Sequence, residues 1–335
     1  MTTTRTAETA AETATAAGEP EAADAALLRL GRALKQEGYR FTTVTPATHA
    51  RVNARPANAV ARDLRDVFGW SRPFRPGVVP DELMALLREA GALAPVTSAG
   101  EELWRSLVRF SSYDDELFVH SAFPTDAEGS VFFGPDTYRM ADAVADHVLG
   151  RRDPVERAVD IGCGTGAGAI AVAKRAPGAD VIAVDINPVA LRYAKVNAAL
   201  AGVGDRVHTR RSDLLSDVGG GLDLIFSNPP FMIDPAGRTY RDGGGDTGND
   251  LSLRIIDVAA ERLLPGGSLV LFSGTGIAGG HDPLREAAGK RLAGTGLAWT
   301  YREVDPDVYG EELESGAYAW ADRIAVVLLI ATRTR

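Results

Sequence analysis

The chain has 335 residues, of which 45% are hydrophobic, so it is long and apolar enough for a full core and more than one domain. Its single cysteine, Cys163, excludes an intrachain disulfide and favours a reducing compartment. No apolar run approaches the roughly 20 residues of a membrane span, and a net charge of −9 argues against general nucleic-acid affinity. We therefore expect a cytoplasmic protein without a membrane-spanning segment.

The N-terminal part is predicted to be a disordered tail followed by a small helical domain. Residues 1–24 are mostly Thr, Ala and Glu, which bury too little apolar surface to order themselves. Residues 25–130 then form the domain. Its predicted elements are helices at 25–38, 57–68 and 81–91 and strands at 107–110 and 116–120. Helices followed by a hairpin are typical of a winged-helix-like module, which we interpret as a cap or lid over a substrate.

A basic segment lies inside this domain. Residues 29–75 carry ten Lys/Arg against three acids, on an otherwise acidic chain. Such a segment either contacts phosphates or pairs with acids of the following domain. We favour the pairing, which leaves nucleic acid as the less supported partner.

Residues 131–335 alternate between predicted strands and helices, after a linking helix at 137–148. The strands are 156–161, 180–185, 206–210, 222–227, 268–273, 297–304 and 323–332; the helices are 165–175, 188–201, 251–263 and 283–293. This alternation predicts a mostly parallel sheet, covered by helices, with its ligand at the carboxyl ends of the strands. The last strand has no helical crossover before it and is expected to insert antiparallel.

A glycine turn and two acids form a candidate nucleotide site. Asp160, Gly162, Gly164 and Gly166 join a strand to an Ala-rich helix, where glycines allow close approach of a ligand to the backbone. Asp185 ends the next strand, and its carboxylate suits ribose hydroxyls of either NAD or S-adenosylmethionine. Asp213 follows the third strand and is placed to accept from an adenine amino group. Cys163, within the turn, is interpreted as a packing residue.

The most specific motif is Asn228-Pro229-Pro230-Phe231, directly after the apolar run 222–227. The two prolines have no N–H and cannot continue a strand, so their carbonyls stay free as acceptors. The Asn228 amide adds a further acceptor. Two acceptors with an aromatic face, Phe231, suit a planar –NH2 group.

With these motifs in this order, the chain resembles the class I S-adenosylmethionine-dependent methyltransferases. The amino-methylating branch, which includes protein-glutamine N5 methyltransferases, is the nearest match over roughly residues 130–335. The resemblance implies a seven-stranded, mostly parallel Rossmann-like α/β sheet with S-adenosylmethionine as cofactor. The implied cofactor-binding residues are Asp160, Gly162, Gly164, Gly166, Asp185, Ile186, Asp213, Leu214 and Asn228.

The resemblance also implies the catalytic set Asn228, Pro229 and Phe231. Two departures from the glutamine enzymes are visible: Phe231 stands where they usually carry Tyr, and residues 134–139 only loosely follow their Pro-Arg-Pro-(Asp/Glu)-Thr segment. Tyr138, Pro230 and Tyr240 are expected to line the substrate, and the glycine run 243–248 to form a mobile lid. No metal ligands are assigned.

Three activities follow, and the first is favoured. It is N-methylation of a planar amino or amide group on a small metabolite, a peptide or a protein glutamine, with a role in secondary metabolism. The second is cyclisation of S-adenosylmethionine to azetidine-2-carboxylate and methylthioadenosine, suggested by residues 134–139 and 240–245. The third is N-methylation of a base in ribosomal RNA, in which the basic segment would serve for docking.

Overall fold

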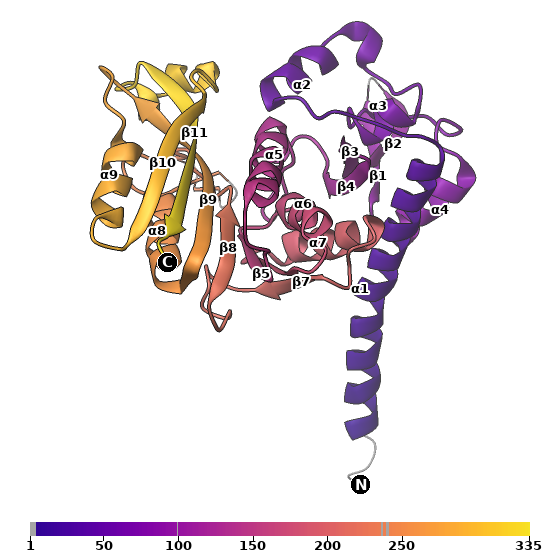
Figure 1. Ribbon diagram of the computed structural model, residues 1–335. Helices are drawn as coiled ribbons and strands as arrows, with labels where there is room; N and C mark the ends of the chain where they lie inside the picture. The colour runs from indigo at the N-terminus through magenta and orange to yellow at the C-terminus, as the bar shows by residue number, and fades with distance from the viewer. Residues whose placement is uncertain (1–4, 99, 236, 239–240) are drawn as a thin grey trace. The chain divides into compact units, whose positions relative to one another are not determined.

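The computed structural model describes residues 5–98, 100–235, 237–238 and 241–335, with side chains from residue 21 onward. The chain divides into two compact units (Figure 1). The first runs through Thr125 and includes residues 199–201, and the second comprises residues 126–198 and 202–335. The division lies close to the boundary predicted at residues 130 and 131.

The first unit begins with a long helix, α1 (Arg5–Gln36), whose apolar positions Leu27, Leu30 and Leu34 are buried. The structure is therefore helical over 5–24, where the sequence predicted a disordered tail. That prediction was made from the small apolar surface that this segment can bury, whereas Ala and Glu favour a helix by their intrinsic propensity. Residues 1–4 of that tail lie outside the described residues. The helix ends before Gly38, which has a φ of 68°.

The remaining helices of this unit are α2 (Pro46–Asn53), the short 3-10 turn η1 (Pro56–Asn58), α3 (Leu64–Phe68) and α4 (Asp81–Glu89). The single helix predicted at 57–68 is wrong. Asp63 caps a new helix, since its side chain accepts from the Asp66 N–H at 2.8 Å. Before it, the Ala61 N–H donates to the Pro73 carbonyl and not to a carbonyl within a helix.

Two antiparallel hairpins complete the first unit. The pair β3 (Val108–Tyr113) and β4 (Glu116–Ser121) is the predicted hairpin. The pair β1 (Leu93–Ser98) and β2 (Glu101–Ser106) was not predicted. A winged-helix-like cap stays an interpretation of this arrangement.

The basic segment forms several ion pairs within its own unit, and its pairing with acids of the catalytic domain stays a prediction. Its ion pairs include Arg29 with Glu89, Lys35 with Glu116, Arg40 with Asp115, Arg72 with Asp66, and Arg75 with Glu101. Most of them are exposed, where an ion pair contributes about 0–1 kcal/mol. The pair of Arg72 and Asp66 is the buried exception.

The second unit is built on a seven-stranded sheet in the order β10-β11-β9-β8-β5-β6-β7. The strands are β5 (Arg157–Ile161), β6 (Asp180–Asp185), β7 (Val207–Arg211), β8 (Leu222–Ser227), β9 (Leu263–Ile277), β10 (Leu297–Asp305) and β11 (Arg323–Arg333). β5 to β9 pair in parallel, and β11 pairs antiparallel with both β9 and β10. The predicted α/β fold, including the antiparallel last strand, is confirmed.

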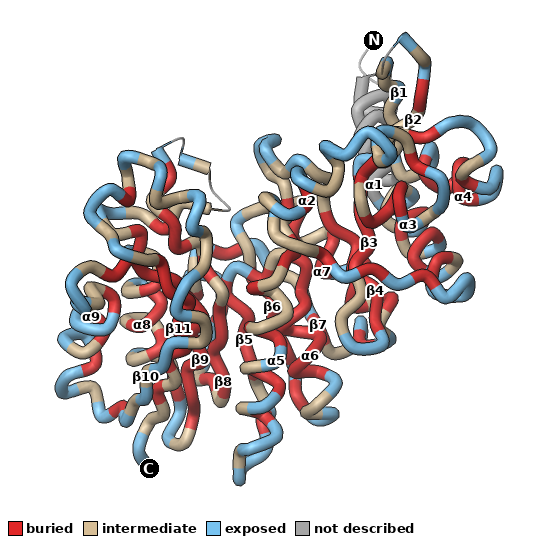
Figure 2. The backbone as a smooth tube through the Cα atoms, turned by 90° about the horizontal axis from the view of Figure 1, so that it is seen from above, coloured by how far each residue is buried: buried red, intermediate tan, exposed pale blue. Residues whose placement is uncertain are grey.

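Helices cover both faces of this sheet (Figure 1). α5 (Pro135–Gly150), α6 (Ala167–Arg175) and α7 (Pro188–Leu200) lie on one face, and α8 (Asp250–Arg262) and α9 (Pro283–Leu292) on the other. The strands β5, β6, β8, β9 and β11 are buried along most of their length, whereas β7 and β10 at the two sides of the sheet are more exposed (Figure 2). Val159, Ile182, Ile225 and Leu271 form one apolar core with α8 and α9. None of the described helices has the length and apolarity that crossing a membrane requires.

Candidate active site

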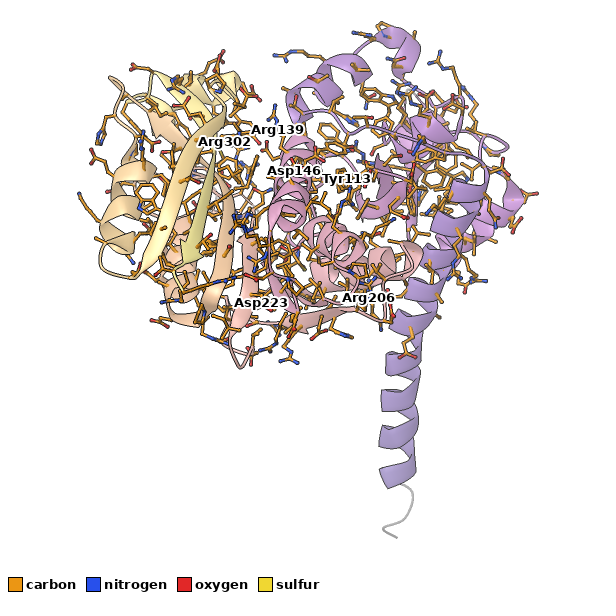
Figure 3. All side chains as sticks on the ribbon, in the orientation of Figure 1. Tyr113, Arg139, Asp146, Arg206, Asp223 and Arg302 are labelled. Carbon is orange, nitrogen blue, oxygen red and sulfur yellow. The ribbon has the colours of Figure 1, made fainter. Side chains whose placement is uncertain are left out.

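The predicted cofactor-binding residues and the Asn228 motif lie at the carboxyl ends of four neighbouring strands, which form one edge of the second unit's sheet. β8, β5, β6 and β7 are neighbours in that order, so the residues after Ser227, Ile161, Asp185 and Arg211 lie side by side. Three strand spacings of about 4.8 Å separate the first from the last, or roughly 14 Å. Asp223, at the start of β8, lies at the opposite end of the sheet from Arg139 on α5 (Figure 3).

The glycine turn between β5 and α6 has the backbone that only glycine adopts readily. Gly162, Gly164 and Gly166 have φ values of 69°, 52° and 75°. A Cβ on Gly166 would lie 3.0 Å from the Ala194 Cβ, whereas one on Gly162 or Gly164 would meet no atom within 4 Å. The turn therefore packs against α7 on one side and leaves open space on the other.

Two asparagines and a serine hold this edge in place. The Asn197 side chain donates to the Thr165 carbonyl at 2.9 Å, and the Ser227 hydroxyl donates to the Ile161 carbonyl at 2.6 Å. Asn187 donates its backbone N–H to Asp185. Sequence reasoning missed these supports; only Asn187, before a proline at a helix start, carried a local signal.

Asp185 ends β6 with both carboxylate oxygens in use. Oδ2 accepts from the Gly164 N–H at 3.0 Å and Oδ1 from the Asn187 N–H at 2.9 Å. Burial raises the pKa of Asp185, and these backbone donors oppose the rise. Carboxylate oxygens have further lone pairs, so the residue both orders the glycine turn and keeps acceptor capacity for a ribose. Ile186, the next residue, is 48% exposed.

Asp160 is turned into the protein. It is 2% exposed and accepts from the Ala169 N–H in the first turn of α6 at 3.1 Å. Burial raises its pKa to about 7, and the charge of Asp185 adds to the rise. Burial likewise raises the pKa of the Cys163 thiol, which agrees with a packing residue.

Asp213 and Leu214 follow β7. Asp213 is exposed and lies 3.3 Å from the Arg254 guanidinium, and Leu214 has a φ of 52°. Both lie at the same edge as Asp185, because the Ser212 N–H donates to the Asp185 carbonyl.

Asn228 follows β8 and carries an unsatisfied acceptor. Its Oδ1 is buried and has no hydrogen-bond partner among the residues that the structure describes. Leaving a buried acceptor unpaired costs about 1–3 kcal/mol, a cost that a ligand N–H would remove. This acceptor and the open glycine turn follow the carboxyl ends of the neighbouring strands β8 and β5.

Phe231 differs from the expectation that it stacks on a substrate. Its side chain is 7% exposed, and a Cβ on Gly274 of β9 would lie 2.4 Å from its ring. Tyr309 lies on another side, with ring centroids 6.2 Å apart. Gly274 and Tyr309 therefore confine the ring, and Phe231 is a buried packing residue rather than a surface on which a substrate stacks.

The glycine run 243–248 was expected to form a mobile lid, but it packs against the backbone at the end of the Asn228 motif. A Cβ on Gly243 would lie 1.8 Å from the Gly248 carbonyl oxygen and 2.8 Å from the Phe231 Cα. The Gly243 N–H donates to the Met232 carbonyl at 2.9 Å. These glycines are needed because the backbone passes directly over the motif.

The three residues expected to line a substrate have different outcomes. Tyr138 lies in the first turn of α5, its ring 5.2 Å from that of Phe133. Pro230 is half-buried beside the buried Pro229. Tyr240 lies outside the described residues.

Comparison with known proteins identifies the domain. Residues 143–287 match the methyltransferase small domain family. Release factor glutamine methyltransferases from Koribacter versatilis and Deinococcus radiodurans are 34% and 36% identical over 52% and 48% of this chain and 62% and 58% of their own. A ribosomal protein uL3 glutamine methyltransferase from Bradyrhizobium diazoefficiens is 35% identical over 42% of this chain and 48% of its own.

The chain thus spans about half to three-fifths of the length of these curated relatives. The matched segment contains the glycine turn, Asp185 and the Asn228 motif, which together form the edge described above. Residues 143–287 are thus similar to the methyltransferase small domain family, and they lie within the seven-stranded, mostly parallel sheet of a Rossmann-like fold.

Proposed function

We propose that this protein is an S-adenosylmethionine-dependent N-methyltransferase acting on a planar amide or amino group, with a protein glutamine as the favoured acceptor. The observation that carries the proposal is the buried Oδ1 of Asn228, which has no partner in the described part of the chain and lies beside the open glycine turn. The names of the relatives, which are glutamine methyltransferases, support the choice of acceptor.

The chain's own residues would hold the cofactor along the edge of the sheet. The glycine turn would receive its methionine part, Asp185 its ribose, and Asp213 its adenine, with Ile186 and Leu214 beside them. S-adenosylmethionine supplies a methyl group on a sulfonium leaving group, so the protein needs mainly to orient the acceptor, which is worth several kcal/mol.

Asn228 and Pro229 would orient the acceptor nitrogen. The Asn228 Oδ1 and the Pro229 carbonyl each accept one N–H, which directs the nitrogen lone pair and stabilises positive charge as the new bond forms. Phe231 would contribute by holding this backbone in place.

A protein acceptor is supported over a small metabolite, because the relatives' names specify glutamine in release factors and in a ribosomal protein. A cytoplasmic location and a role in secondary metabolism stay predictions from the sequence. The basic segment gives methylation of an RNA base no specific support, since Arg29, Lys35 and Arg75 pair with acids of their own unit.

The test uses the full chain with methyl-labelled S-adenosylmethionine and two candidate acceptors, a bacterial release factor and ribosomal protein uL3. We expect label on a glutamine of one of them, located by mass spectrometry of its peptides, and none with Asn228→Ala. Label on a carboxylate oxygen, or in RNA but in neither protein, would contradict the proposal.

A further inference from the structure

The connection between β10 and β11 reaches back to the first turn of α5. It contains the short 3-10 turns η2 (Gly310–Glu314) and η3 (Gly316–Tyr318). Arg139 of α5 lies 2.7 Å from Asp305, the last residue of β10. Four residues later, the Tyr309 hydroxyl donates to the carboxylate of Asp136, also on α5. Two side chains thus bind this connection to the same helical turn.

Tyr309 is held in an unfavourable backbone conformation. Its φ and ψ are 55° and 39°, in the left-handed region that is unfavourable for a residue with a Cβ. Hydrogen bonds fix the backbone on both sides: the Val308 N–H donates to the Ile324 carbonyl, and the Tyr309 carbonyl accepts from Glu312. Such a conformation persists only where the surroundings over-determine it.

The Tyr309 ring contacts the apolar cluster that contains the end of the Asn228 motif. Phe231, Met232 and Tyr318 are buried in this cluster, and Tyr309 packs against it. Phe231 is confined on its other side by Gly274. The same connection also holds the residues that follow the motif. The Tyr318 hydroxyl accepts a hydrogen bond from the Ile233 N–H at 2.9 Å.

We propose that Asp136 and Tyr309 are a pair of positioning residues for the Asn228-Pro229-Pro230-Phe231 motif. Asp136 holds the Tyr309 hydroxyl, Tyr309 confines the Phe231 ring, and the ring fixes the backbone that carries the Asn228 and Pro229 acceptors. This inference rests on the proposed function for its effect on turnover. It also gives a role to residues 134–139, whose part in the site the sequence left open.

We expect the pair to affect turnover and its pH dependence, and not the binding of S-adenosylmethionine. Asp136 is 6% exposed and faces Tyr309, Arg139 and Asp305; burial raises its pKa, while the hydrogen bond from Tyr309 lowers it. Removing the hydroxyl takes away one of the hydrogen bonds to the carboxylate and keeps that from Arg139, so the pKa of Asp136 should rise further. The acid limb of the turnover profile should move to higher pH.

The experiment compares Tyr309→Phe, Asp136→Asn and the double variant with Tyr301→Phe. Tyr301 is a matched control because its hydroxyl donates to Asp282 at 2.7 Å, a similar pair in the same unit that includes no residue of the motif. We expect kcat to fall about tenfold or more in each single variant and no further in the double, with the S-adenosylmethionine Kd within about twofold. Tyr301→Phe should keep its kcat.

Amide hydrogen exchange provides a readout that needs no turnover. Exchange at Phe231, Met232 and Ile233 should be faster in Tyr309→Phe than in wild type, with the central strands unchanged, and the acid limb of kcat should shift upward. Unchanged local exchange and an unchanged kcat would overturn the positioning role. If the wild type transfers no methyl group, the proposed function fails, and the exchange result alone decides the pair.

Discussion

At the end of β6, Asp185 binds two backbone N–H groups and faces the open side of the glycine turn. Replacing it with alanine should weaken S-adenosylmethionine binding at least tenfold, because lost hydrogen bonds to a charged group cost about 1.5–3 kcal/mol. Asp180→Ala, at the exposed start of the same strand, is the matched control and should change the Kd less than twofold. Titration calorimetry measures both; equal affinities would remove Asp185 from the site.

Asn228 should separate binding from chemistry. Its Oδ1 is proposed to act on the acceptor nitrogen, so Asn228→Ala should lower turnover about a hundredfold or more and leave the S-adenosylmethionine Kd nearly unchanged. Steady-state kinetics and calorimetry on the same preparation give the two quantities, with thermal unfolding as the control for folding. A variant that retained most of its turnover would show that the motif is structural only.

The glycine turn should depend on Gly166 for stability. Its positive φ and the 3.0 Å approach to Ala194 make a Cβ there strained, so Gly166→Ala should cost about 1–3 kcal/mol. Gly178→Ala is the control, because a Cβ on this exposed glycine meets no atom within 4 Å. Thermal unfolding should show a Tm several degrees lower for the first variant only; equal Tm values would contradict the strain.

The buried strands were predictable, and the first unit was less so. β6 and β8 have the predicted bounds because strands buried on both faces are continuous apolar runs between turn residues. The β1 and β2 hairpin was missed because its strands are only half-buried and include Pro95. Likewise the glycine turn and the Asn228 motif are local signals, whereas Tyr309 meets Asp136 across 173 positions, which no local pattern reveals.

The first unit should lose stability in mild acid. His49 is 1% exposed, and burial, together with the charges of Arg109 and Arg72, lowers its pKa to about 4. The unfolded chain has the ordinary pKa of about 6.5 and binds the proton first, so this contribution is complete above pH 6.5 and is lost as the pH falls toward 4.

We expect this one group to lower the free energy of unfolding by on the order of 2 kcal/mol over that range. Urea unfolding at pH 7.5 and pH 4.5 measures the difference. His49→Gln should show a smaller difference, because it removes one of the titrating groups. An equal pH dependence in both proteins would mean that His49 is protonated alike in the folded and unfolded states.

The products formed from S-adenosylmethionine test methyl transfer most directly. The protein is incubated with S-adenosylmethionine alone and with an acceptor protein, and the products are separated by chromatography. If Asn228 and Pro229 orient an external amino group, as proposed, S-adenosylhomocysteine should form only when the acceptor is present. Methylthioadenosine accumulating above the spontaneous background, with no acceptor added, would contradict methyl transfer and indicate cyclisation of S-adenosylmethionine instead.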